Sequence, residues 1–160
     1  MESKNQLVML MEKYQVENIL RVNEYTEKFG LTLSMEDARV LAKSKNETLK
    51  EEQRVELGES ILPKIILCFC DSNYIDQNNF VENIIRLQEI FFMYKNESMD
   101  ELSDDELLDF MEKKFHGECE GSLEYLETTV LDEFARNIRR NTRRYFGSYR
   151  DDEEGMENEL

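Results

Sequence analysis

The stretch KKFHGECEG, residues 113–121, holds the only histidine of the chain, His116, and a cysteine, Cys119, three positions later. The stretch LCFCD, residues 67–71, supplies the other two cysteines, Cys68 and Cys70. Three cysteines and one histidine are the donor types of a closed tetrahedral zinc site. These four residues are therefore the first candidates for chemistry.

The spacing of the four residues argues against a metal site. Structural zinc sites usually have two to four residues between paired cysteines, whereas one residue separates Cys68 from Cys70. On a helix these two side chains point to opposite sides, so we interpret both as core residues. His116 and Cys119 are the only metal candidates left, and a pair is half a site. We expect a helix end and a tight loop there, with no metal, cofactor or catalytic residue.

A run of carboxylates lies before a predicted helix, and it consists of Asp100, Glu101, Asp104, Asp105, Glu106 and Asp109. The run lacks the central glycine of an EF-hand calcium loop. Ser103 and Glu106 have the spacing of a capping box, and carboxylates at a helix start are favourable with the helix dipole. We interpret the run as a solvated helix start. A carboxylate di-iron bundle is excluded, because it needs two Glu-x-x-His pairs.

The C-terminal part of the chain carries a group of arginines with helical spacing: Arg136, Arg139, Arg140, Arg143 and Arg144. At about 100° per residue these arginines fall within a sector of about 140°, opposite the apolar residues of the same helix. Guanidinium groups suit bidentate recognition of carboxylate or phosphate. The arginine face is our candidate partner-binding surface. The alternative is a solvated face that pairs with the acidic residues of 101–132.

Helices must position these residues, because apolar residues recur with a period near 3.6 in almost every segment and strict alternation is nearly absent. Only six glycines and one proline are present, fewer than turn-rich β proteins require. We predict an all-α fold, a compact single-domain bundle of about six or seven helices that spans residues 1–150. Residues 151–160 are predicted to be an acidic, disordered tail.

Local signals predict the ends of the first helices. Apolar residues 7–11 indicate an early turn or helix whose apolar phase slips near Gln15, and the next apolar residues indicate a helix that ends at Gly30. Ser34 and Asp37 form a capping box that starts another helix. The alternating stretch RVELG, residues 54–58, predicts a short extended segment.

The two most apolar helices are predicted at residues 61–70 and 79–94, and we expect them to pack together as the core. Pro63 is compatible with the first of them because it lies in the first turn. The second has a wider apolar band than a surface helix needs. A homodimer that covers part of this band is therefore an open alternative.

Three stretches carry a family resemblance: ILPKIILCFCDSNYI, LQEIFFMYKNESMDELSDDELLDFM and GECEGSLEYLE. Over about residues 30–140 the chain resembles an uncharacterised family of small bacterial cytosolic proteins, a domain of unknown function. The resemblance implies a bacterial cytosolic protein. It transfers no catalytic or binding residue, because the family has no known activity.

Composition narrows the function further. The chain has 160 residues and a net charge of −16, which argues against binding of DNA or of an anionic membrane. The start of the chain lacks a signal peptide and no apolar stretch is long enough for a membrane span, so three reduced thiols in the cytoplasm are expected.

We therefore predict a protein-interaction module whose partner is another protein, and a non-enzymatic role is favoured. The alternatives are a metal- or redox-responsive protein that uses His116 and the cysteines, and a weak binder of RNA or an acidic ligand that uses the arginine face.

Overall fold

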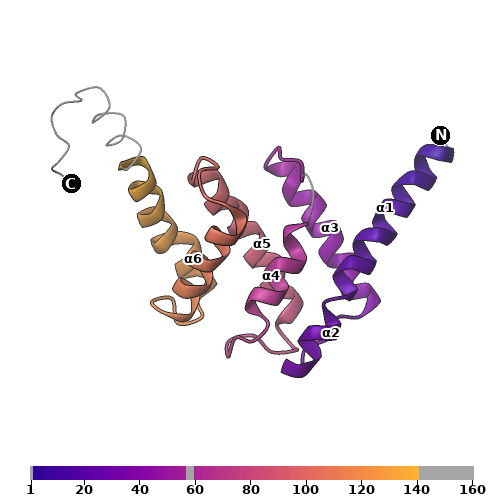
Figure 1. Ribbon diagram of the computed structural model, residues 1–160, viewed down its shortest axis with the longest axis horizontal. Helices are drawn as coiled ribbons and strands as arrows, with labels where there is room; N and C mark the ends of the chain where they lie inside the picture. The colour runs from indigo at the N-terminus through magenta and orange to yellow at the C-terminus, as the bar shows by residue number, and fades with distance from the viewer. Residues whose placement is uncertain (1, 57–59, 141–160) are drawn as a thin grey trace.

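The computed structural model describes residues 2–56 and 60–140 of the chain. Within these ranges the secondary structure consists of helices, and no strand occurs, so the predicted all-α fold is confirmed. Figure 1 shows the helices side by side in a row, with α1 (Glu2–Leu20) at one end and the helical residues 131–140 at the other. Arg143, Arg144 and the predicted tail lie outside the described residues.

The first segment is one unbroken helix where two pieces were expected. α1 runs straight through Gln15, although the apolar phase slips there, and the chain then turns at residues 21–22. After the turn follow α2 (Asn23–Thr26) and the short 3-10 helix η1 (Glu27–Phe29). A single helix up to Gly30 was therefore a wrong prediction, because the helix breaks after Leu20. Gly30 does end the segment, with a left-handed φ of 79°.

The side chain of Asn23 explains the break after α1. Its Nδ2 donates to the carbonyl of Leu33 at 2.9 Å, and its Oδ1 accepts from the amide of Leu33 at 2.8 Å. The buried hydroxyl of Thr26 donates to the carbonyl of Leu31 at 2.8 Å. These bonds hold residues 31–33 against α2, which a helix continuing straight from α1 would not allow.

Serine residues cap the next two helices, and the first of these caps was predicted. α3 (Met35–Glu51) starts at Ser34, whose hydroxyl forms the expected capping box with Asp37. α4 (Ile61–Phe69) starts at Ser60, and Pro63 lies in its first turn, where a missing amide donor costs nothing. Residues 54–56 of the predicted extended segment form neither helix nor strand, and residues 57 and 58 lie outside the described residues.

The centre of the molecule is α5 (Phe80–Glu97), which contacts α3, α4 and α6. The expected packing of the two most apolar helices is therefore confirmed. The buried side chains of α5 include Phe80, Ile84, Leu87, Ile90, Phe91, Phe92 and Tyr94. A helix with neighbours on several sides needs a wide apolar band. Packing inside one chain therefore explains the wide apolar band of α5, on which the homodimer alternative was based.

The acidic run begins α6 (Asp104–His116), as the capping box predicts. The hydroxyl of Ser103 accepts from the amide of Glu106, and the carboxylate of Glu106 accepts from the amide of Ser103. Other carboxylates of the run pair with cations of neighbouring segments, such as Asp104 with Lys95 at 2.7 Å and Asp100 with Arg54 at 3.0 Å. The run therefore joins α6 to α5 and to the loop after α3.

The last described segment contains a π-helical turn that the sequence did not predict. α7 (Leu123–Tyr125) leads into the π-helix η2 (Leu126–Val130), which continues as the helical residues 131–140. The buried hydroxyl of Tyr94 on α5 donates to the carbonyl of Leu126 at 2.6 Å, which satisfies a carbonyl at the start of this turn. The described part of the helix predicted from Val130 is confirmed as far as residue 140.

One continuous cluster of buried apolar side chains extends from Val16 on α1 to Phe134 in the last described helix. This cluster confirms the predicted bundle for the described part of the chain. Within residues 2–56 and 60–140, no helix is both long and apolar enough to cross a membrane.

Candidate functional site

His116 ends α6 and packs among aromatic rings. Its ring lies 6.5 Å from the ring of Phe69 and 6.0 Å from that of Tyr74, measured between centroids. The Nδ1 atom is 2.9 Å from the carbonyl oxygen of Glu112, which can accept a hydrogen bond from it. The ring is thereby fixed at the end of its helix beside a small hollow that is lined by Asp71, Asn73, Glu112 and Lys113.

The structure does not combine the cysteines with His116. Cys119 and Cys70 are buried in the core, and Cys68 is half-buried on α4. Burial raises the pKa of the Cys119 thiol to about 11, and burial with the nearby Glu112 raises that of Cys68 to about 12. Across residues 2–56 and 60–140 no three His, Cys, Asp or Glu side chains form a metal-binding group. The geometry therefore gives His116 and Cys119 no further ligands.

The described arginines of the candidate arginine face point to solvent. Arg136, Arg139 and Arg140 are exposed on the helical residues 131–140. Arg139 lies 3.5 Å from the carboxylate of Glu97, and Arg140 bonds Asn137 on its own helix. The described part of the arginine face is therefore exposed, and recognition of a partner by it stays a prediction.

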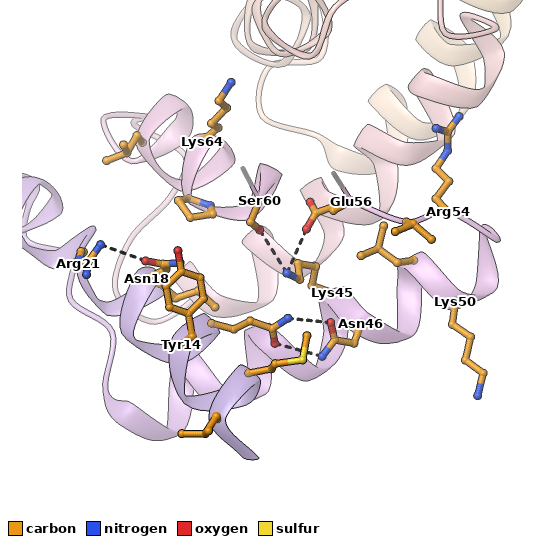
Figure 2. A pocket seen from close by; sticks show the side chains of 18 residues that line it. Tyr14, Asn18, Arg21, Lys45, Asn46, Lys50, Arg54, Glu56, Ser60 and Lys64 are labelled. Atoms are coloured by element: carbon orange, nitrogen blue, oxygen red, sulfur yellow. Dashed lines mark hydrogen bonds and ion pairs between the residues drawn. The ribbon is translucent and has the colours of Figure 1, made fainter. Parts of the chain in front are cut away.

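A larger concave site lies at the other end of the molecule. We call it the α1 groove: an open groove of about 1160 Å³ between α1, α3, α4 and residues 54–56. Figure 2 shows its lining, in which Tyr14 and Asn18 come from α1, Lys45 and Asn46 from α3, and Lys64 from α4. The sequence analysis did not identify this groove.

One wall of the α1 groove is an exposed apolar face of α1, which we call the α1 stripe: Leu7, Leu10, Met11 and Tyr14. These side chains are 57%, 64%, 56% and 64% exposed, and the last three line the groove. At about 100° per residue the four lie within about 100° of one another, on the side opposite the buried Val16 and Ile19. Val8 and Met9, on the same side of α1 as Val16 and Ile19, are 50% and 66% exposed, so residues 7–11 of α1 are exposed on all sides and only the C-terminal half of the helix packs against the core.

A nearly buried ion pair lies at the centre of the α1 groove. The Lys45 Nζ atom is 3.1 Å from Glu56 Oε1 and 3.5 Å from the hydroxyl of Ser60, as Figure 2 shows. The second oxygen of Glu56 accepts from the amide of Ile61 at 2.8 Å. Glu56 therefore links α3 to the first turn of α4 and fixes the floor of the groove.

The remaining cations of the groove surround this pair. Its described lining contains Arg21, Lys45, Lys50, Arg54 and Lys64 but only one carboxylate, Glu56. The groove is therefore locally cationic in a chain with a net charge of −16. The arrangement has the parts of a binding surface, which are an apolar wall, a polar floor and a charged rim.

One signal in the sequence points to this surface. The apolar residues 7–11 are five in a row, so on an unbroken helix they cover its whole circumference, and some of them must face away from the core that the other end of the helix contacts. The basic rim leaves no such signal, because its residues come from four separate parts of the chain.

Comparison with known proteins gives one match. A family model described as "Family of unknown function (DUF6323)" matches residues 18–144, which is most of the chain. No curated protein matches the chain, and no solved structure does. The matched region includes the α3 and α4 walls of the groove and begins after the α1 stripe.

Proposed function

The chain belongs to this family of unknown function, and we propose that it is an interaction module that binds a helical segment of another protein in the α1 groove. The observation that carries this proposal is the α1 stripe, an apolar face beside an open groove on a helix whose C-terminal half already contacts the core. We also place the protein in a bacterial cytosol, where its three free thiols would stay reduced.

The energetics of the exposed stripe favour a partner. Covering a large apolar side chain contributes on the order of 1.5 to 3 kcal/mol, and four such side chains lie together. Single exposed apolar residues are ordinary on protein surfaces, but a contiguous apolar face beside a groove is typical of an interaction site. We therefore expect the stripe to be covered when the protein acts.

The spacing of the stripe favours a helical occupant. Leu7, Leu10, Met11 and Tyr14 stand at positions i, i+3, i+4 and i+7, the pattern with which two helices pack. Helix-in-groove recognition uses an apolar stripe on the bound helix and an apolar wall on the receptor. The groove supplies such a wall on α1 and further apolar side chains, Leu49 and Leu67, on α3 and α4.

The proposal can be tested with a photo-crosslinking residue placed on α1. Tyr14 is replaced by benzoylphenylalanine in the full chain, which is then expressed and irradiated in its native host. Tyr25 on α2, 44% exposed and outside the groove lining, is the matched control position. We expect one dominant adduct at position 14 that maps to a helical segment of another protein. The same adducts at both positions, or none at position 14, would refute the proposal.

A further inference from the structure

We infer that the segment bound by the α1 groove is an acidic amphipathic helix of another protein. This inference rests on the proposed function and names the chemistry of the partner. It is carried by the charge of the described groove lining, which contains five cationic side chains and one carboxylate while the chain as a whole has a net charge of −16. A ligand with carboxylates is the complement to such a surface.

The cations of the groove differ in what already neutralises them. Lys45 is paired with Glu56, Arg54 with Asp100 at 3.0 Å, and Lys64 with Asp105 at 3.4 Å. Arg21 and Lys50 are exposed and have no carboxylate partner among the described residues, since Arg21 only bonds Asn18. Two cations on the rim are thus available for carboxylates of a ligand.

The positions of these two cations define where the acidic residues of the ligand would lie. Figure 2 shows Lys45 at the middle of the site, with Arg21 and Lys50 on opposite sides of it; Lys50 reaches outward and Arg21 lies beside Asn18. Leu49 and three side chains of the α1 stripe line the same groove. A bound helix therefore needs an apolar stripe toward α1 and a carboxylate on each flank, the pattern of an acidic amphipathic helix.

Among the described residues we find no other exposed segment of this chain with that pattern. The acidic start of α6 is already capped and paired, and its apolar face is buried in the core. The C-terminal residues 151–160 carry six carboxylates but only two large apolar residues, Met156 and Leu160. A second copy brings the same net negative charge, and the exposed charged residues beside its α1 stripe, Lys13 and Glu17, give no excess of carboxylates.

The test uses two fluorescent helical peptides of about 18 residues with the same apolar positions. One carries Glu on both flanks of the apolar stripe and the other carries Lys at those positions. Binding to the full chain is measured by anisotropy at about 50 and about 300 mM NaCl. We expect the Glu peptide to bind at least roughly tenfold more tightly than the Lys peptide at low salt, with the difference shrinking at high salt.

Three variants locate the binding. Lys50→Glu should weaken binding of the Glu peptide by roughly tenfold and leave binding of the Lys peptide unimpaired, because the substitution reverses an exposed charge on the rim of the groove. Arg136→Glu, an equally exposed cation on the arginine face, is the matched control and should change neither affinity. Tyr14→Asp, at a position 64% exposed, should abolish the binding of both peptides.

The outcomes separate this inference from the proposed function. Equal affinity for the two peptides, with loss of both in Tyr14→Asp, overturns the acidic partner and leaves helix binding intact. No binding of either peptide overturns the proposed function as well. Loss of Glu-peptide binding in Arg136→Glu instead of Lys50→Glu moves acid recognition to the arginine face. Two further results also overturn the inference: binding that requires removal of residues 151–160, and a dimer in light scattering that Tyr14→Asp dissociates.

Discussion

Glu56 is the residue on which the shape of the α1 groove depends. One carboxylate oxygen faces the ammonium of Lys45 at 3.1 Å, and the other accepts from the amide of Ile61 at 2.8 Å. The Lys45 side chain is only 6% exposed, so little water is available to replace Glu56. Removing one member of such a pair leaves the other charge nearly buried without a partner, which is costly.

We therefore predict that Glu56→Gln lowers the free energy of unfolding by about 3 kcal/mol, as expected for an isolated charge left in a nearly buried site. Urea denaturation followed by circular dichroism measures the change. Glu47→Gln is the control, because Glu47 lies on the exposed face of α3 and forms no ion pair with a described residue. Equal effects of the two substitutions would show that the Lys45–Glu56 pair does not stabilise the fold.

The thiols give a second prediction at the scale of the residue, a loss of stability in alkali. Burial raises the pKa of Cys119 from 9.0 to about 11. Above about pH 9 the unfolded chain releases a proton that the folded chain retains. The Cys119 thiol therefore makes its full contribution to the free energy of unfolding below pH 9, and this contribution is lost as the pH rises toward 11.

Between about pH 9 and 10.5 the free energy of unfolding should fall, with a slope from Cys119 of up to about 1.4 kcal/mol per pH unit. The slope of Cys119→Ala should be shallower than that of the unsubstituted chain. Burial also raises the pKa values of Cys68, Cys70 and Tyr94, which contribute to the slope in both proteins. Identical slopes would mean that the Cys119 thiol titrates equally in the folded and unfolded states.

At the scale of the element, α5 is the helix that the others share. Phe91 is 1% exposed and its ring packs edge-on against that of Phe92, with 5.2 Å between centroids. Phe91→Ala should lower the free energy of unfolding by about 3 to 5 kcal/mol, because the cavity loses both burial and contacts. Phe29→Ala is the matched control, since Phe29 is 40% exposed at the end of η1. If Phe91→Ala and Phe29→Ala had the same denaturation midpoint, α5 would not be the centre of the core.

Local signals were sufficient to predict most of the elements. Ser34 and Ser103 start their helices as predicted because a capping box acts within four residues, and Gly30 ends its segment for the same local reason. The break after α1 was not predictable in this way. It depends on the contact of Asn23 with the backbone of Leu33, ten residues later.

The candidate site was harder to predict than the elements, because it depends on which faces are left uncovered. Residue types drew attention to His116 and Cys119, but folding directs the thiol of Cys119 into the core. The phase slip near Gln15 was visible in the sequence, and only the unbroken α1 turns it into an exposed apolar stripe. Lys50 and Arg21 belong to one site only through the packing of α1 on α3.

At the scale of the whole molecule, the net charge of −16 opposes folding, because the carboxylates repel one another in the folded chain. The same charge repels an acidic ligand everywhere except at a cationic surface such as the α1 groove. Both effects are electrostatic and both are screened by salt, but they have opposite consequences. Screening relieves the repulsion among carboxylates of the folded chain, whereas it weakens attraction between the groove and a negatively charged helix.

We therefore predict that raising NaCl from about 50 to 500 mM increases the thermal midpoint, by on the order of 2 to 4 °C for each kcal/mol of relieved repulsion. Over the same range the affinity for the Glu peptide should fall, because the contacts of Arg21 and Lys50 are exposed. Thermal melts and anisotropy on the same samples measure both trends. A thermal midpoint that falls with salt would show that ion pairs such as Arg54–Asp100 outweigh the repulsion in the folded chain, so the net charge would not be what limits its stability.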